Sequence, residues 1–194
     1  VLTSKIAQHL ISKGEQARIE SHIEQAKEAL SKIKPLESGA ATSIIELPTK
    51  DPKFCGRDKE LKNLENLCSQ NQRVAITGLG GIGKTALAIE YANQHKSQSE
   101  VIYFIDGSDP ATIEIGLLRL ADDLKIAGEK PAERLENLKA KLRGKPNCLL
   151  IFDGVDHNSG FEYLEAHLPT QTQCIIVTTR MAEEAGCHLN SSSM

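Results

Sequence analysis

The first 34 residues carry apolar side chains at helical spacing. Apolar residues recur there at steps of four, three, four and three, at Ile19, Ile23, Ala26, Leu30 and Ile33. This is the stripe of a heptad-type helix, and a shorter stripe precedes it. The pattern predicts a helical segment over residues 1–34, either a hairpin of two helices or a single helix that packs on the domain behind it.

Residues 35–53 lose this periodicity. Proline, glycine, serine and threonine are frequent there, a composition typical of loops and linkers. We therefore expect a linker over residues 35–53 and place the domain boundary in it. A second domain is expected over residues 54–190, followed by a short tail over residues 191–194.

Beyond the linker, short apolar runs alternate with helical patterns. The apolar runs predict strands over residues 74–77, 101–105, 149–152 and 175–177. The helical periodicity predicts helices over residues 58–70, 84–95, 110–126 and 132–143. Strands that are apolar on both faces and alternate with helices indicate a three-layer α/β fold with a parallel sheet. Right-handed crossovers then place all C-terminal strand ends at one edge.

A glycine-rich loop follows the first of these strands. Residues 78–85 read Gly-Leu-Gly-Gly-Ile-Gly-Lys-Thr, which matches the phosphate-loop pattern G-x-x-x-x-G-K-[ST]. The glycines Gly78, Gly80, Gly81 and Gly83 allow successive backbone N–H groups to wrap a phosphate. Because the match lies between a predicted strand and a predicted helix, we expect the fold of a P-loop NTPase.

The start of the next helix completes the expected phosphate site. This helix begins near Lys84 and adds the positive end of its dipole, while the Lys84 ammonium directs a charge toward the β- and γ-phosphates. Thr85 offers a hydroxyl to Mg²⁺. The expected nucleotide contacts also include Ile82 and Ala86.

An acid ends the apolar run 149–152. The buried strand delivers Asp153 to the edge of the sheet where the phosphate loop lies, and a carboxylate there can hold Mg²⁺, usually through water. Asp156, three residues later, is a candidate for orienting the attacking water. The alternative interpretation of Asp156 is a turn residue or a helix cap.

A guanidinium follows the last predicted strand. Residues 175–177 are followed by Thr178, Thr179 and Arg180. From that edge of the sheet, Arg180 is able to reach a γ-phosphate and sense its presence; the alternative is an ordinary surface arginine. Because Arg180 and Asp153 must both lie beside the phosphates, we predict the strand order 1-4-3-2, counting the phosphate-loop strand as 1.

The order of these motifs resembles a known family. Residues 54–61 read Phe-Cys-Gly-Arg-Asp-Lys-Glu-Leu and precede the phosphate loop, which is followed by the run ending in Asp153 and by Thr178-Thr179-Arg180. The set is similar to the nucleotide-binding core of NB-ARC proteins over residues 54–186. These are STAND-class P-loop NTPases found in plant resistance proteins, apoptosis activators and bacterial regulators.

The resemblance implies a signalling module that binds ATP or ADP with Mg²⁺, hydrolyses ATP slowly and acts as a nucleotide-dependent switch. By motif position, it implies that Phe54, Cys55 and Arg57 line the adenine–ribose side and that Arg180 is the sensor. In this family the flanking regions bind protein partners, and here those regions include residues 1–34.

Two departures from the family pattern bear on catalysis. The family usually has a second acid, or Asn, directly after the Mg²⁺ carboxylate, where this chain has Gly154. The subdomains that follow the sensor motif in the family are absent from the sequence, so we expect a chain truncated after that motif. A nucleotide-binding scaffold without turnover therefore stays an alternative. A small-molecule kinase is a third, but residues 107–147 offer only helical arginines for its lid.

Composition limits the kinds of partner that the protein can bind and the compartments in which it is expected. Lys and Arg number 23 against 26 Asp and Glu, and aromatic residues make up 4% with no Trp, which excludes a strongly basic nucleic-acid binder. No apolar run approaches the ~20 residues of a membrane span, and no signal sequence is visible, so we predict a cytoplasmic protein. Five cysteines without a CxxC pair, including Cys148 and Cys174 as expected core residues, favour free thiols.

Overall fold

The computed structural model describes residues 43–70, 73–143, 145, 147–169 and 174–181. The helical segment predicted over residues 1–34, the predicted tail over residues 191–194 and Cys187 lie outside these residues.

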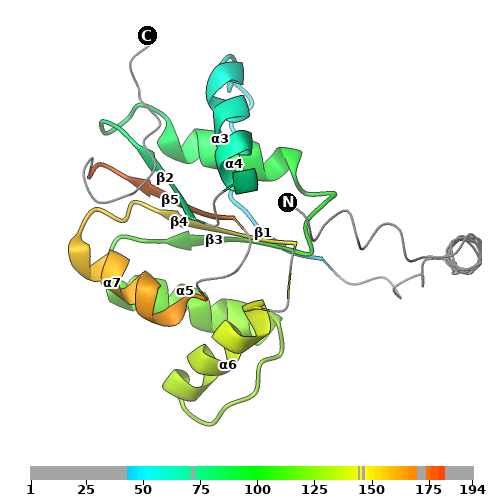
Figure 1. Cartoon of the computed structure of the whole chain (residues 1–194), viewed down its shortest axis with the longest axis vertical. Coiled ribbons are helices and arrows are strands. Elements are labelled where there is room, and N and C mark those ends of the chain that lie inside the picture. The colour runs from blue at the N-terminus through cyan, green and yellow to red at the C-terminus, as the bar shows by residue number, and fades with distance from the viewer. Residues whose placement is uncertain (1–42, 71–72, 144, 146, 170–173, 182–194) are drawn as a thin grey trace, which may run out of the picture. The chain divides into compact units, whose positions relative to one another are not determined.

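Five parallel strands form one sheet in the described part of the chain (Figure 1). In chain order they are β1 (Ile44–Glu46), β2 (Arg73–Thr77), β3 (Val101–Asp106), β4 (Cys148–Asp153) and β5 (Ile175–Thr179). Their spatial order is β1-β3-β4-β5-β2, and every neighbouring pair is parallel. Counted from the phosphate-loop strand β2, the predicted order 1-4-3-2 is confirmed, with β1 added at the far edge.

Helices cover both faces of this sheet. α3 (Asp58–Gln70) and α4 (Lys84–Gln94) lie on one face, and α5 (Pro110–Asp123), α6 (Pro131–Arg143) and α7 (Asn158–His167) lie on the other (Figure 1). Side chains alternate along each strand. Ile151 therefore enters the apolar cluster beneath α3 and α4, whereas Phe152 enters the cluster beneath α5, α6 and α7. No helix among the described residues is long and apolar enough to cross a bilayer.

The edge strand β1 corrects one expectation. It lies inside residues 35–53, for which the sequence predicts a linker, yet Ile44 pairs with Val101 of β3. The Ile44 N–H also donates to the Glu100 carbonyl oxygen at 2.9 Å. The strand has only three residues, too few to show a recognisable alternation of apolar and polar side chains in the sequence. Its β-branched residues suit a strand that pairs at the edge of the sheet.

Helix α7 is a second element that the sequence analysis does not predict. Its N-cap is His157, whose Nδ1 accepts a hydrogen bond from the Gly160 N–H at 3.0 Å. Histidine is not among the usual capping residues. The start of this helix therefore carries no recognisable signal in the sequence.

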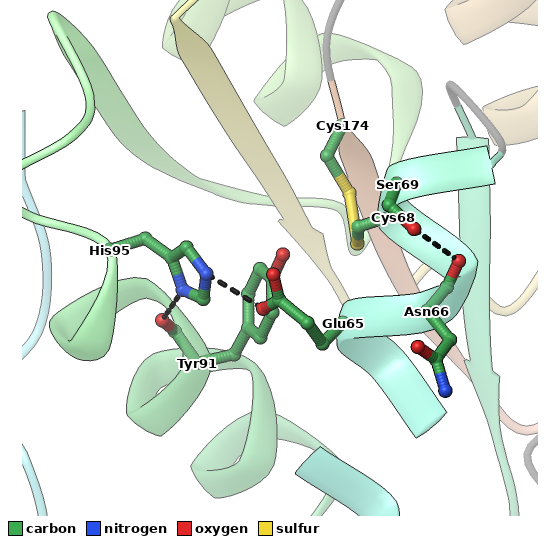
Figure 2. Close-up of a disulfide and its surroundings, with 7 residues drawn as sticks. All are labelled: Glu65, Asn66, Cys68, Ser69, Tyr91, His95 and Cys174. Atoms are coloured by element: carbon green, nitrogen blue, oxygen red, sulfur yellow. Dashed lines mark hydrogen bonds and ion pairs between the residues drawn. A yellow bond between two sulfur atoms is a disulfide. The ribbon is translucent and has the colours of Figure 1, made fainter. Parts of the chain in front are cut away.

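A disulfide joins α3 to the residue that precedes β5, as Figure 2 shows. Cys68 and Cys174 are 106 residues apart in the sequence, and their Cα atoms are 5.3 Å apart. The expectation of free thiols is wrong for these two cysteines, because the packing of α3 against the sheet brings them together. Cys148 is buried, as predicted, and has a free thiol, as does the exposed Cys55. Burial raises the pKa of the Cys148 thiol to about 12, which keeps it protonated.

Replacing both Cys68 and Cys174 by serine is expected to lower the free energy of unfolding in oxidising buffer by about 2–4 kcal/mol, since the crosslink restricts the unfolded chain. The variant should still fold, because the fully buried Leu64 keeps α3 packed in the apolar cluster that it shares with α4 and the sheet. Urea denaturation measures the loss, and dithiothreitol should reproduce it in proteins that keep the disulfide but not in the double variant. Cys55→Ser is the matched control; equal stability of all three proteins would contradict the prediction.

Candidate functional site

The loop between β2 and α4 is built to face an anion. α4 begins at Lys84 after Gly83, which adopts a left-handed conformation (φ 91°) and provides no side-chain cap. The first N–H groups of such a helix have no partner within it, and they include those of Lys84, Thr85 and Ala86. At Gly81 (φ 76°) an added Cβ would meet nothing within 4 Å, so the loop is open on that side. Unpaired N–H groups and a helix dipole together favour a phosphate.

The Lys84 side chain folds back over this loop and bonds to its first two residues. Its Nζ donates to the Gly78 carbonyl oxygen at 2.9 Å and to the Leu79 carbonyl oxygen at 3.0 Å. The Leu79 side chain is 78% exposed, so the loop is reached from solvent. The ammonium group therefore lies beside the loop that would bind a phosphate. Its hydrogen bonds are to neutral carbonyl oxygens, which a charged ligand can replace.

A carboxylate and two hydroxyls meet beside the loop. The Thr85 hydroxyl donates to Asp153 Oδ1 at 2.7 Å, and the Thr178 hydroxyl donates to the same oxygen at 2.6 Å. The contact joins the start of α4 to the ends of β4 and β5. A hydroxyl and a carboxylate are hard oxygen ligands of the kind that Mg²⁺ prefers, so the donor set of Thr85 and Asp153 fits this ion. No such role for Thr178 follows from the sequence alone.

The turn after Asp153 is fixed by β5. The Gly154 N–H donates to the carbonyl oxygen and to the hydroxyl of Thr178, at 3.1 and 2.9 Å. Gly154 has a φ of 79°, in the left-handed region that favours glycine. An added Cβ would meet nothing within 4 Å. The position that the family gives to a second acid is therefore open, but its backbone suits glycine.

Asp156 holds Arg180. Asp156 Oδ1 accepts the Arg180 backbone N–H, and Oδ2 accepts Arg180 Nε, each at 2.6 Å. The Asp156 side chain is 22% exposed and the Arg180 side chain 66%. Although desolvation raises the pKa of Asp156, the hydrogen bonds and charge of Arg180 outweigh it and hold that pKa below its usual value.

Arg180 also lies against the phosphate loop. A Cβ built on Gly80 would be 4.0 Å from Arg180 Cδ. The predicted sensor is therefore brought to the loop, together with Lys84 and Asp153. The predicted use of Asp156 to orient water stays a prediction, and both of its oxygens face Arg180.

The segment before α3 reaches the loop through Arg57. The Arg57 guanidinium donates to the Ile82 carbonyl oxygen, and it lies 3.6 Å from the position of a Cβ on Gly83. Phe54 packs against the apolar cluster beneath α3 and α4, and the Cys55 thiol is exposed. The structure thus brings Arg57 to the loop, while an adenine–ribose site formed by these residues stays a prediction.

Strand order, loop and acid define a class of protein. The phosphate loop follows β2, the next strand β5 carries Arg180 at its end, and the following strand β4 carries Asp153. A parallel sheet with this loop at its C-terminal edge is a P-loop NTPase domain, a nucleotide-binding module. The NB-ARC domain description matches residues 57–193. The chain belongs to the NB-ARC family, as its motif order predicts.

Individual relatives are similar over part of their length. A nucleotide-binding leucine-rich repeat (NLR)-like protein of Hyaloscypha variabilis is 33% identical over 118 residues, which is 54% of this chain and 12% of that protein. A Walker-type ATPase of Pyrococcus abyssi overlaps 70% of this chain and 48% of its own, with 16% identity and a TM-score of 0.40. The structural overlap is too slight to support an argument about function.

Proposed function

We propose that this chain is a nucleotide-dependent switch that binds ATP or ADP with Mg²⁺ and hydrolyses ATP slowly. The observation that carries the proposal is the convergence of Lys84, Asp153 and Arg180, from α4, β4 and the end of β5, around one phosphate loop. Two cations and a carboxylate around a loop with unpaired N–H groups suit a ligand that carries phosphates and a metal ion. The relative from Hyaloscypha variabilis, whose name includes the words nucleotide-binding, supports the proposal.

Each group has a role that follows from its chemistry. The Lys84 ammonium exchanges two carbonyl contacts for phosphate oxygens, because a charge-assisted hydrogen bond is the stronger one. The N–H groups of residues 80–86 bind the remaining phosphate oxygens. Thr85 and Asp153 would hold Mg²⁺, which when bound neutralises the phosphates. Arg180 contacts a γ-phosphate and thereby distinguishes ATP from ADP.

The adenine–ribose side is assigned to Phe54, Cys55 and Arg57. The support is the contact between Arg57 and Ile82, which brings this segment to the loop. The segment is also attached further back, where Lys50 pairs with the largely buried Glu90 of α4 at 2.8 Å. A nucleotide bound against Arg57 would therefore contact both the segment before α3 and the phosphate loop.

Slow turnover follows from the residues at positions 154 and 156. Gly154 offers no carboxylate to orient a water molecule, and Asp156 is engaged by Arg180. The same observation supports the second candidate, a nucleotide-binding scaffold without turnover. Single-turnover measurements with γ-labelled ATP separate the two. Release of phosphate more slowly than the ~1 s⁻¹ low end of ordinary enzymes supports the slow ATPase, and no release supports the scaffold.

Replacing Asp153 by asparagine is expected to remove the Mg²⁺ dependence of ATP binding. Asparagine keeps the shape and an oxygen acceptor for Thr85, but it loses the charge that attracts the ion. EDTA should weaken ATP binding by the unmodified chain at least about tenfold, equivalent to ~1.4 kcal/mol. Calorimetry should show that Asp153→Asn binds ATP equally with and without EDTA.

Asp106→Asn is the control for this experiment. Asp106 ends β3 in direct register with Asp153 and is exposed, so it places a carboxylate at the same edge of the sheet. This variant should keep the EDTA sensitivity of the unmodified chain. If Asp106→Asn loses that sensitivity while Asp153→Asn keeps it, the neighbouring strand holds the metal and the assignment of Asp153 is wrong.

Signalling through protein partners belongs to the same proposal. The partners are expected to bind the flanking regions, including the predicted helical segment over residues 1–34. The cytoplasmic location stays a prediction.

A further inference from the structure

In the Asp156–Arg180 ion pair, the two carboxylate oxygens contact different parts of Arg180. One carboxylate oxygen accepts the Arg180 backbone N–H and the other accepts Nε of the same residue. The first contact fixes the main chain just after β5, and the second fixes the direction in which the side chain leaves it. The Thr179 hydroxyl lies 3.3 Å from Oδ1 and accepts the Met181 N–H at 3.0 Å. The carboxylate thus orders the whole end of this strand.

The contact through Nε leaves the rest of the guanidinium available. Among the described residues, the two Nη groups of Arg180 take no hydrogen bond. The side-chain stem passes Gly80 of the phosphate loop, and two-thirds of the side chain is exposed. A guanidinium presents its donors in a rigid fork, so a contact at Nε determines where the Nη donors lie.

We infer that Asp156 is a positioning residue that holds Arg180 beside the phosphate loop with its Nη groups free for the γ-phosphate of ATP. The inference rests on the proposed function and specifies how its sensor works. A long, exposed arginine loses rotamer freedom when a ligand fixes it. Asp156 removes that freedom before the nucleotide arrives, so the γ-phosphate meets an ordered donor. ADP lacks this phosphate and gains nothing from the arrangement.

The sign of the change in ATP affinity tests this role. A carboxylate that competed with the γ-phosphate for Arg180 would weaken ATP binding, so its removal would strengthen ATP binding. A carboxylate that positions Arg180 through Nε strengthens ATP binding, so its removal weakens it. The sign of the change therefore decides between the two.

The experiment is calorimetric titration of the 194-residue chain with ADP and with an ATP analogue whose β–γ bond resists hydrolysis. Asp156→Asn is expected to bind the analogue about threefold to tenfold more weakly, in proportion to the ordering of one arginine, and to bind ADP as before. Unchanged or tighter binding of the analogue overturns the inference. A purely structural role would change both affinities together, which also overturns it.

The matched control is Asp122→Asn. Asp122 forms an aspartate–arginine pair of the same kind with Arg134, between α5 and α6. Its loss should leave both affinities unchanged. Should Asp156→Asn lose ADP binding through misfolding, Asp156→Glu decides, because glutamate keeps the charge but moves the carboxylate by one methylene away from its contacts with the Arg180 N–H and Nε. It should lose the preference for the analogue, and a retained preference overturns the inference.

Arg180→Ala separates this inference from the proposed function. If Arg180→Ala does not change the ratio of the two affinities, Arg180 is not the sensor and that part of the proposed function fails. If it lowers the ratio while Asp156→Asn does not, only the positioning role fails. In the Arg180→Ala background, Asp156→Asn is expected to have no further effect, and an additive effect overturns the inference.

Discussion

Replacing Lys84 by alanine is expected to abolish measurable binding of both ATP and ADP. A hydrogen bond from a charged group is worth about 1.5–3 kcal/mol, and the ammonium is placed to reach two phosphates. Loss of both contacts corresponds to roughly a 10²- to 10⁴-fold fall in affinity. Calorimetric titration with each nucleotide measures the effect.

The fold should survive this substitution. Lys84 bonds only to the carbonyl oxygens of Gly78 and Leu79 within its own loop, whereas α4 is anchored by the buried Leu87 and Ala88. Thermal unfolding of the variant should match that of the unmodified chain. Lys96→Ala, which removes an exposed lysine just beyond α4, is the control with the same change of charge. Unchanged nucleotide affinity in Lys84→Ala would show that the phosphate loop is not the nucleotide site.

The parts of the site that the sequence predicts are those whose chemistry is local. The phosphate loop requires glycines, a lysine and a helix start that are consecutive in the chain. Asp153 is recognisable because it ends an apolar strand. The strand order followed from the requirement that Asp153 and Arg180 meet the same loop, and the sheet has that order.

The parts that the sequence does not predict depend on contacts between distant residues. The Cys68–Cys174 bond forms because α3 packs against β2, the strand that pairs with β5. Thr178 acquires its importance by donating to Asp153 from the neighbouring strand. The contacts of both Asp156 carboxylate oxygens with Arg180 likewise do not follow from the sequence. In each case the sequence spacing between the two residues does not indicate that they are in contact.

Replacing Gly154 by aspartate is expected to raise the rate of ATP hydrolysis about 100-fold, because positioned general bases contribute ~10²–10⁴-fold. The family usually has an acid at this position, and the space around a Cβ at Gly154 is empty to 4 Å. The left-handed backbone, with a φ of 79°, disfavours a side chain by roughly 1–2 kcal/mol, and aspartate tolerates it better than most residues. The variant should therefore fold with a modest loss of stability.

Gly154→Ala separates the carboxylate from the strain. Alanine imposes a comparable backbone cost but offers no base, so its single-turnover rate with γ-labelled ATP should equal that of the unmodified chain. Urea denaturation of both variants should show similar losses of stability, which ties any difference in rate to the carboxylate. If Gly154→Asp binds ATP normally and hydrolyses it no faster, the missing acid is not what limits turnover. The next position to test would then be Arg180, which also lies against the phosphate loop.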